Sequence, residues 1–88
     1  MSTYKVTANF SSTPSVAQVN KARNKVAHWT TPEGTDWEKA KSSVKVATKG
    51  NRVHLVYKMA KARNNGAIAQ KIDNSLKGVS GYKSMTIA

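Results

Sequence analysis

The sequence predicts one small α+β domain that spans residues 1–88. A chain of 88 residues has room for one modest core, since a chain this short buries only about 60–65% of the surface that its unfolded form exposes. Segments with a two-residue apolar period alternate with segments of helical period. With 39% hydrophobic and 22% charged residues, the chain is also too apolar for a disordered basic tail. We therefore expect a folded unit in which strands and helices share one core.

The first strand and the first helix are predicted in the first third of the chain. Residues 3–10 alternate polar side chains with apolar ones, as a strand with one buried face does. Ser11 to Thr13 then offer helix-capping hydroxyls, and Pro14 stands where the first helical residue is expected. The helix that follows has an apolar stripe at three- and four-residue spacing, which consists of Val16, Val19, Ala22, Val26 and Trp29.

The middle of the chain predicts a loop, a short helical turn and a hairpin. Pro32 and Gly34 end the first helix, and residues 35–38 form a possible capping box for one turn through Lys41. Residues 43–49 and 52–59 have strand character on either side of the Gly50-Asn51 turn signal. A rival interpretation makes residues 55–63 helical, but the β-branched and aromatic residues in 53–57 favour a strand.

The last third predicts a second long helix and a closing strand. The helix begins near residues 64–66, has a stripe that includes Ile72 and Leu76, and ends at Gly78 in the C′ position. In residues 82–88, Met85 and Ile87 alternate with polar neighbours. The resulting β-α-β-β-α-β order predicts a ferredoxin-like domain, in which two helices cover one face of a four-stranded antiparallel sheet. Because this fold serves many activities, it does not define the function.

The charge of the chain favours polyanionic partners. Fifteen Lys and Arg side chains stand against four acids, which gives a formal net charge of +11. Three of those acids, Glu33, Asp36 and Glu38, lie within residues 33–38, where there is no base. The remaining residues carry the 15 bases and Asp73 alone, a formal charge of +14. A field of this sign attracts nucleic acid, anionic lipid or an acidic protein.

Enzymatic chemistry is not indicated by the sequence. The first strand is followed by Phe10-Ser11-Ser12-Thr13-Pro14 instead of a glycine-rich anion loop, and Asn9 stands where a metal nuclease would need an acid. His28 and His54 are isolated in the sequence, and the chain has no cysteine. We therefore expect no catalytic residues, no metal and no cofactor. No signal peptide or long apolar run is evident, so we expect no membrane insertion and a cytoplasmic location, or a virion assembled in the cytoplasm.

The candidate binding residues are basic side chains on the predicted open face of the sheet. If the apolar residues of each strand face the helices, alternation sends the others to that face. Such a face binds phosphates and releases counterions, although a solvated face that serves solubility is the alternative. A second basic cluster next to the start of the second helix is a candidate phosphate site. Together these predicted nucleic-acid-binding residues are Lys5, Lys45, Lys49, Arg52, His54, Lys58, Lys61, Arg63 and Tyr82.

The aromatic residues limit the kind of binding that we expect. Modules that read the sequence of single strands stack bases on exposed rings of the central strands, whereas this sequence offers Thr7 and His54 there. Tyr82 is the one expected stacking platform. Trp37 lies in the acidic loop, where it either binds a partner or folds back over the edge of the core.

Three functional hypotheses follow from the sequence. The first is a small non-enzymatic protein that binds DNA or RNA through the phosphate backbone with weak sequence preference. The second is a phage-encoded or regulatory protein whose basic surface and Trp37 loop bind an acidic host protein. The third is a structural subunit that assembles around nucleic acid. A homodimer through the open face is a further alternative, although five like charges oppose it unless a polyanion bridges them.

Overall fold

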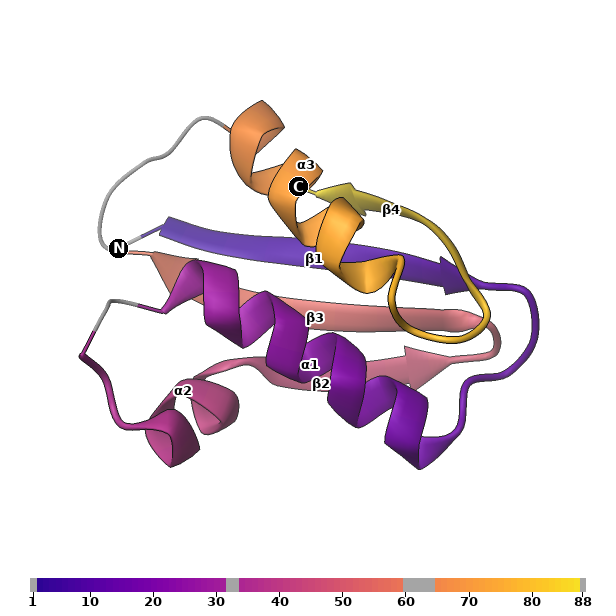
Figure 1. Cartoon of the computed structure of the whole chain (residues 1–88), viewed down its shortest axis with the longest axis horizontal. Helices are drawn as coiled ribbons and strands as arrows, with labels where there is room; N and C mark the ends of the chain where they lie inside the picture. Colours follow the sequence, from indigo (N-terminus) through magenta and orange to yellow (C-terminus); the bar gives the residue numbers. More distant parts are fainter. Residues whose placement is uncertain (1, 32–33, 60–64, 88) are drawn as a thin grey trace.

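The computed structural model describes residues 2–31, 34–59 and 65–87, which form four strands and three helices (Figure 1). The prediction of an α+β arrangement is confirmed, with one helix more than the two expected. Along the chain the elements are β1 (Ser2–Phe10), α1 (Val16–Thr30), α2 (Trp37–Ser43), β2 (Lys45–Lys49), β3 (Arg52–Met59), α3 (Asn65–Leu76) and β4 (Tyr82–Ile87).

The strands form one antiparallel sheet in the order β2-β3-β1-β4. The predicted hairpin is confirmed: Lys49 pairs with Arg52 across the turn, and Gly50 has a φ of 59°, a conformation that favours glycine. The rival helix over residues 55–63 is wrong for residues 55–59, because β3 pairs there with β1 and its side chains alternate between two faces. Residues 60–63 lie outside the described residues.

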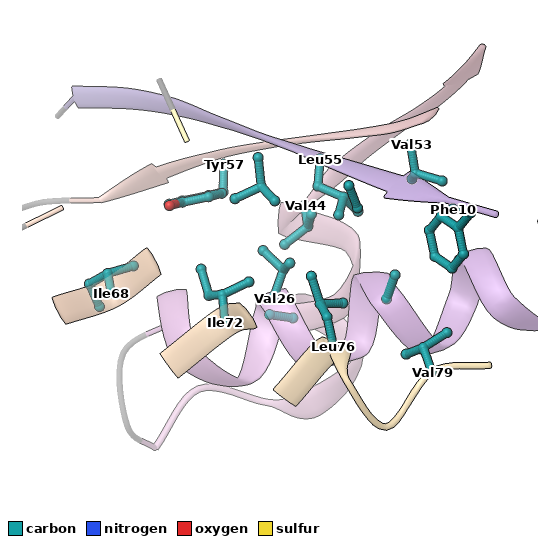
Figure 2. Packing of buried hydrophobic residues seen from close by; sticks show 14 residues of the cluster. Phe10, Val26, Val44, Val53, Leu55, Tyr57, Ile68, Ile72, Leu76 and Val79 are labelled. Carbon is teal, nitrogen blue, oxygen red and sulfur yellow. The ribbon is translucent and has the colours of Figure 1, made fainter. Parts of the chain in front are cut away.

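The core lies between one face of the sheet and the helices. Figure 2 shows apolar side chains from the strands meeting those of α1 and α3, with the sheet above and the helices below. Each such side chain contributes roughly 1.5–3 kcal/mol to folding when it is fully buried. The largest fully buried ones are Leu55, Ile72, Leu76, Val6, Val26 and Val53. The opposite face of the sheet is not covered by the helices (Figure 1).

Helix α1 begins later than the sequence predicts. Ser15 is the N-cap: its hydroxyl accepts a hydrogen bond from Gln18 N (3.2 Å), and the Gln18 side chain accepts one from Ser15 N (2.6 Å). Pro14 therefore precedes the helix instead of opening it. The prediction that Val16 is a core residue is wrong, because the side chain in the first helical position is 77% exposed. The buried stripe consists of Ala22, Val26, Ala27 and Thr30.

Helix α2 is longer than the single turn predicted. It is capped by Asp36, whose Oδ1 accepts hydrogen bonds from Glu38 N (3.0 Å) and Lys39 N (3.3 Å), instead of by Thr35. Glu38 in turn pairs with Lys41 at 2.8 Å. Both described acids of the loop therefore have local structural partners, while Pro32 and Glu33 lie outside the described residues.

The turn before β4 is hydrogen-bonded to the first turn of α1 and to the residue that follows β1. Gly78 does not take the left-handed conformation expected of a C′ glycine; Gly81 does, with a φ of 81°. The Gln18 side chain donates a hydrogen bond to Ser80 O, and Ser11 N donates one to Gly81 O at 2.9 Å. None of the helices among the described residues has the length and apolar character needed to span a bilayer.

A basic sheet face as the candidate functional site

The register of the sheet defines which side chains share its open face. Paired residues of antiparallel strands point to the same side, and the partners of the buried residues Val6, Val53 and Leu55 belong to the covered side. The alternate positions form four rows across the open face. From one end of the sheet to the other, these rows are Lys58 and Thr3; Lys45, Val56 and Lys5; Ala47, His54, Thr7 and Thr86; and Lys49, Arg52, Asn9 and Ser84.

Five basic side chains lie on this face, which we call the open face. They come from three strands and are all exposed: Lys5, Lys45, Lys49, Arg52 and Lys58. No acid lies in the four rows, and the salt bridges among the described residues, Lys41–Glu38 and Lys77–Asp73, belong to the helical side. The positive charge of the open face is therefore not compensated by described residues of the domain.

Two of these bases face each other directly. Lys49 on β2 is the cross-strand partner of Arg52 on β3. Like charges in such a pair are unfavourable, and two unit charges about 6 Å apart repel each other by about 0.7 kcal/mol in bulk water. An anion bound between them would replace this repulsion with attraction.

Polar side chains occupy the other half of the open face. The Thr7 hydroxyl lies 3.2 Å from His54 Nδ1, within hydrogen-bond distance, and both side chains are half-buried. Asn9 Nδ2 donates a hydrogen bond to Ser84 Oγ at 3.3 Å. Hydroxyl and amide groups of this kind donate hydrogen bonds to phosphate oxygens. Sequence reasoning placed Thr7, Asn9 and His54 here, but it did not include Thr3 or Val56 on this face.

The prediction that Tyr82 lies on the open face is wrong. The pairing of β1 with β4 shifts between Asn9 and Phe10, so Tyr82 pairs with Phe10 on the covered side. Its ring packs edge-on against Phe10 with centroids 6.1 Å apart, and its hydroxyl donates a hydrogen bond to Asp73. Burial, that hydrogen bond and the charge of Asp73 all raise the pKa of Tyr82. The open face therefore has no aromatic ring for stacking among its described residues other than the imidazole of His54.

The second predicted basic cluster is only partly described. Lys58 is exposed at the end of β3, whereas Lys61, Arg63 and Asn64 lie outside the described residues. The prediction of a phosphate site at the start of α3 therefore stays a prediction.

Trp37 lies apart from the open face, on the helical side. It opens α2 with 45% of its surface exposed, and Lys41 Nζ is 5.8 Å from its ring centroid. Together with Trp29 and His28 it lines a surface hollow of about 590 Å³ beside α1. Trp37 therefore lies outside the core and outside the open face.

Among the described residues, no group of three or more His, Asp or Glu side chains is arranged to hold a metal ion. Comparison of the chain with protein-family models, with curated proteins and with solved structures finds no match. The function is therefore inferred from the charge and geometry of the surface.

Proposed function

We propose that this protein is a small non-enzymatic nucleic-acid-binding protein that uses its open face to bind the phosphate backbone. The observation that carries this proposal is the gathering of five exposed bases on one sheet face without an ion-pair partner among the described residues. Each phosphate that such a base neutralises releases condensed counterions, which favours binding in ordinary salt.

Weak sequence preference belongs to the same proposal. Sequence-specific recognition of single strands uses rings that stack on bases, and the covered position of Tyr82 removes the ring expected on the open face. Threonine, serine and asparagine side chains beside the bases are suited to hydrogen bonds with phosphate and sugar oxygens. We further propose that the sheet and its helices form a ferredoxin-like domain that acts in the cytoplasm, with α2 as an addition.

The experiment that tests this function is a salt series of binding to DNA and RNA, each single- and double-stranded. Wild-type affinity should fall steeply with salt, with a slope of log K against log salt of roughly −3 to −4 for four or five phosphate contacts. Exchanging Lys5, Lys49 and Arg52 together for Gln should remove two or three contacts and make the slope shallower by about 2.

The matched control exchanges three exposed lysines of the helical side, Lys21, Lys71 and Lys77, for Gln. Both variants lower the net charge equally, so a difference between them reports where the nucleic acid lies. If the two variants lose affinity equally, or if wild-type binding is insensitive to salt, the open face is not the binding surface.

A second candidate function, binding of an acidic protein, is favoured by the exposure of Trp37 at the start of α2. Large aromatic side chains are common anchors in protein interfaces. In the same experiment, Trp37→Ala should leave the nucleic-acid affinity within about twofold of wild type if nucleic acid is the partner, because a contact that is not made contributes no binding free energy. Binding of a poly-glutamate peptide that is tighter than binding of nucleic acid at the same salt concentration, and that Trp37→Ala abolishes, would support the protein partner instead.

A further inference from the structure

A cavity of about 480 Å³ opens at the edge of the sheet and is lined by residues of α2, β2 and β3. β2 starts only at Lys45, which pairs with Val56, so the last residues of β3 have no partner from β2 on this side. Thr31 and Thr35 from the segment after α1, together with residues of α2, border the space that remains. The described residues that line the cavity are Thr30, Thr31, Thr35, Lys39, Ser43, Lys45, Val56, Tyr57 and Lys58.

Three lysines from three different elements line this cavity. Lys39 comes from α2, Lys45 from β2 and Lys58 from β3, and all three are exposed. No described lining residue is acidic, and neither of the salt bridges among the described residues involves these lysines. Basic residues from three elements give the border of the cavity a positive charge, and a bound anion would be attracted to it.

The second observation is a buried hydroxyl that has no partner. The Tyr57 side chain is 3% exposed and its ring stacks on Tyr4 with centroids 5.7 Å apart, yet its hydroxyl makes no hydrogen bond. Figure 2 shows this hydroxyl at the end of the ring that points away from Leu55 and Val53, on the side of the cluster where Ile68 lies. Buried polar groups in proteins are nearly always hydrogen-bonded, so an unpaired one at a cavity indicates a missing ligand or water.

A second hydroxyl at the same cavity is also buried and unpaired. Thr31 Oγ1 is buried without a hydrogen-bond partner. Burial and the neighbouring Tyr4 raise the pKa of Tyr57 to about 12, so its hydroxyl keeps its proton at neutral pH and serves as a donor. The cavity thus combines positive charge at its rim with two unused hydroxyl donors in its wall.

We propose that this cavity binds a phosphate monoester on an organic body of nucleotide size, as in a free nucleotide or at the phosphorylated end of a nucleic-acid strand. A monoester carries a charge of about −1.5 to −2 at neutral pH, more than the single charge of a backbone diester, and it has three acceptor oxygens. Three lysines and two hydroxyls complement that group better than a diester. The volume also lies within the usual range of small-ligand pockets, about 300–1,000 Å³.

This site is separate from the proposed backbone contacts but continuous with them. Lys45 and Lys58 belong both to the cavity and to the open face, whereas Lys39 and Tyr57 belong to the cavity alone. A strand that lies along the open face could therefore end in the cavity. Variants of Lys39 and Tyr57 test the cavity without altering the open face.

The experiment compares ligands that differ only in the terminal phosphate. In the first arm, the amide resonances of Thr31, Tyr57 and Lys58 are followed by NMR during titration with adenosine 5′-monophosphate and with adenosine. In the second arm, fluorescence anisotropy measures the affinity for a short oligothymidylate with a 5′-phosphate and for the same strand with a 5′-hydroxyl. We expect the phosphorylated ligand to bind at least about tenfold more tightly, as one additional charge-assisted hydrogen bond would give.

Variants locate the phosphate. Lys39→Gln and Tyr57→Phe should each reduce this preference by at least about fivefold, and Tyr57→Phe removes only an oxygen that has no partner in the free protein. Lys41→Gln, on the same helix but outside the cavity lining, is the matched control and should keep the preference.

The outcomes distinguish a free nucleotide from a strand end as the source of the phosphate. They also distinguish failure of the cavity proposal from failure of the open-face proposal. A preference in the nucleotide arm alone assigns the site to a free nucleotide, and a preference in the oligonucleotide arm assigns it to a strand end. The proposal is wrong if neither arm shows a preference for phosphate, or if the preference persists in both Lys39→Gln and Tyr57→Phe. Failure of the open-face proposal is seen independently, as strand binding that does not respond to salt or to loss of Lys5, Lys49 and Arg52.

Discussion

Two tyrosines show how the same residue type acquires opposite roles from its partners. Tyr82 donates its hydroxyl proton to Asp73 on α3 in a hydrogen bond, whereas the Tyr57 hydroxyl is buried without a partner. A hydrogen bond to a charged group contributes about 1.5–3 kcal/mol, while a buried unpaired hydroxyl costs about 1–3 kcal/mol. The hydroxyl of Tyr82 is therefore explained by its contribution to stability. The hydroxyl of Tyr57 is explained better by a hydrogen bond to a bound ligand.

This contrast gives a prediction for stability. Tyr82→Phe should lower the free energy of unfolding by about 1 kcal/mol, less than the full range because Asp73 and Tyr82 are only half-buried. Tyr57→Phe should leave it unchanged or raise it by up to about 1 kcal/mol, because the ring keeps its stacking on Tyr4. Urea denaturation of both variants and the wild type measures the difference. A loss of stability in Tyr57→Phe as large as that in Tyr82→Phe would mean that the Tyr57 hydroxyl has a structural partner.

Among the helices and strands, the periodicity of the sequence was sufficient to predict most of the elements and their order. The hairpin turn at Gly50-Asn51 and the alternation in β1 and β3 are local signals, and the structure has them where the sequence places them. The face of Tyr82 could not be predicted in the same way. It depends on a register shift between β1 and β4, which are far apart in the sequence, and a single inserted residue exchanges the two faces of a strand.

The start of α1 shows a different limit of sequence reasoning. Several hydroxyl side chains in residues 11–15 can cap a helix, and the choice of Ser15 depends on Gln18, which also reaches Ser80 before β4. The cap is thus selected partly by a tertiary contact. The lining of the cavity was missed for a similar reason, since Lys39, Lys45 and Tyr57 come from separate elements with no common spacing.

The two hydrogen bonds of the Gln18 side chain give a prediction for the stability contributed by the start of α1. Ser15→Ala should lower the free energy of unfolding by about 1 kcal/mol through loss of the capping hydroxyl. Gln18→Ala should cost more, about 1.5–2 kcal/mol, because it removes both the reciprocal cap bond and the bond to Ser80 O. Thermal and urea unfolding of the two variants test this order. Equal losses would show that the contact of Gln18 with the turn before β4 contributes nothing.

For the whole molecule, the net charge of +11 has a spatial arrangement that the sequence predicted in part. Five bases lie on the open face as expected, and the described acids lie on the helical side. The second predicted basic cluster includes Lys61 and Arg63, which lie outside the described residues. The helical side carries bases together with the described acids, whereas the rows of the open face carry bases without an acid. Like charges gathered on one face repel one another, and a bound polyanion would replace that repulsion with attraction.

A polyanion should therefore stabilise this protein far more than simple salt does. A ligand that binds only the folded state at a hundred times its Kd adds about 2.7 kcal/mol to the free energy of unfolding, which for a domain of this size raises Tm by roughly 10–20 °C. Differential scanning fluorimetry with a short oligothymidylate, and with sodium chloride at the same ionic strength, measures the two shifts. The oligonucleotide shift should shrink strongly in the Lys5, Lys49 and Arg52 to Gln variant and persist in the Lys21, Lys71 and Lys77 to Gln control. If sodium chloride produces the same shift, screening of self-repulsion accounts for it, and the clustering of bases on the open face needs no bound phosphate to explain it.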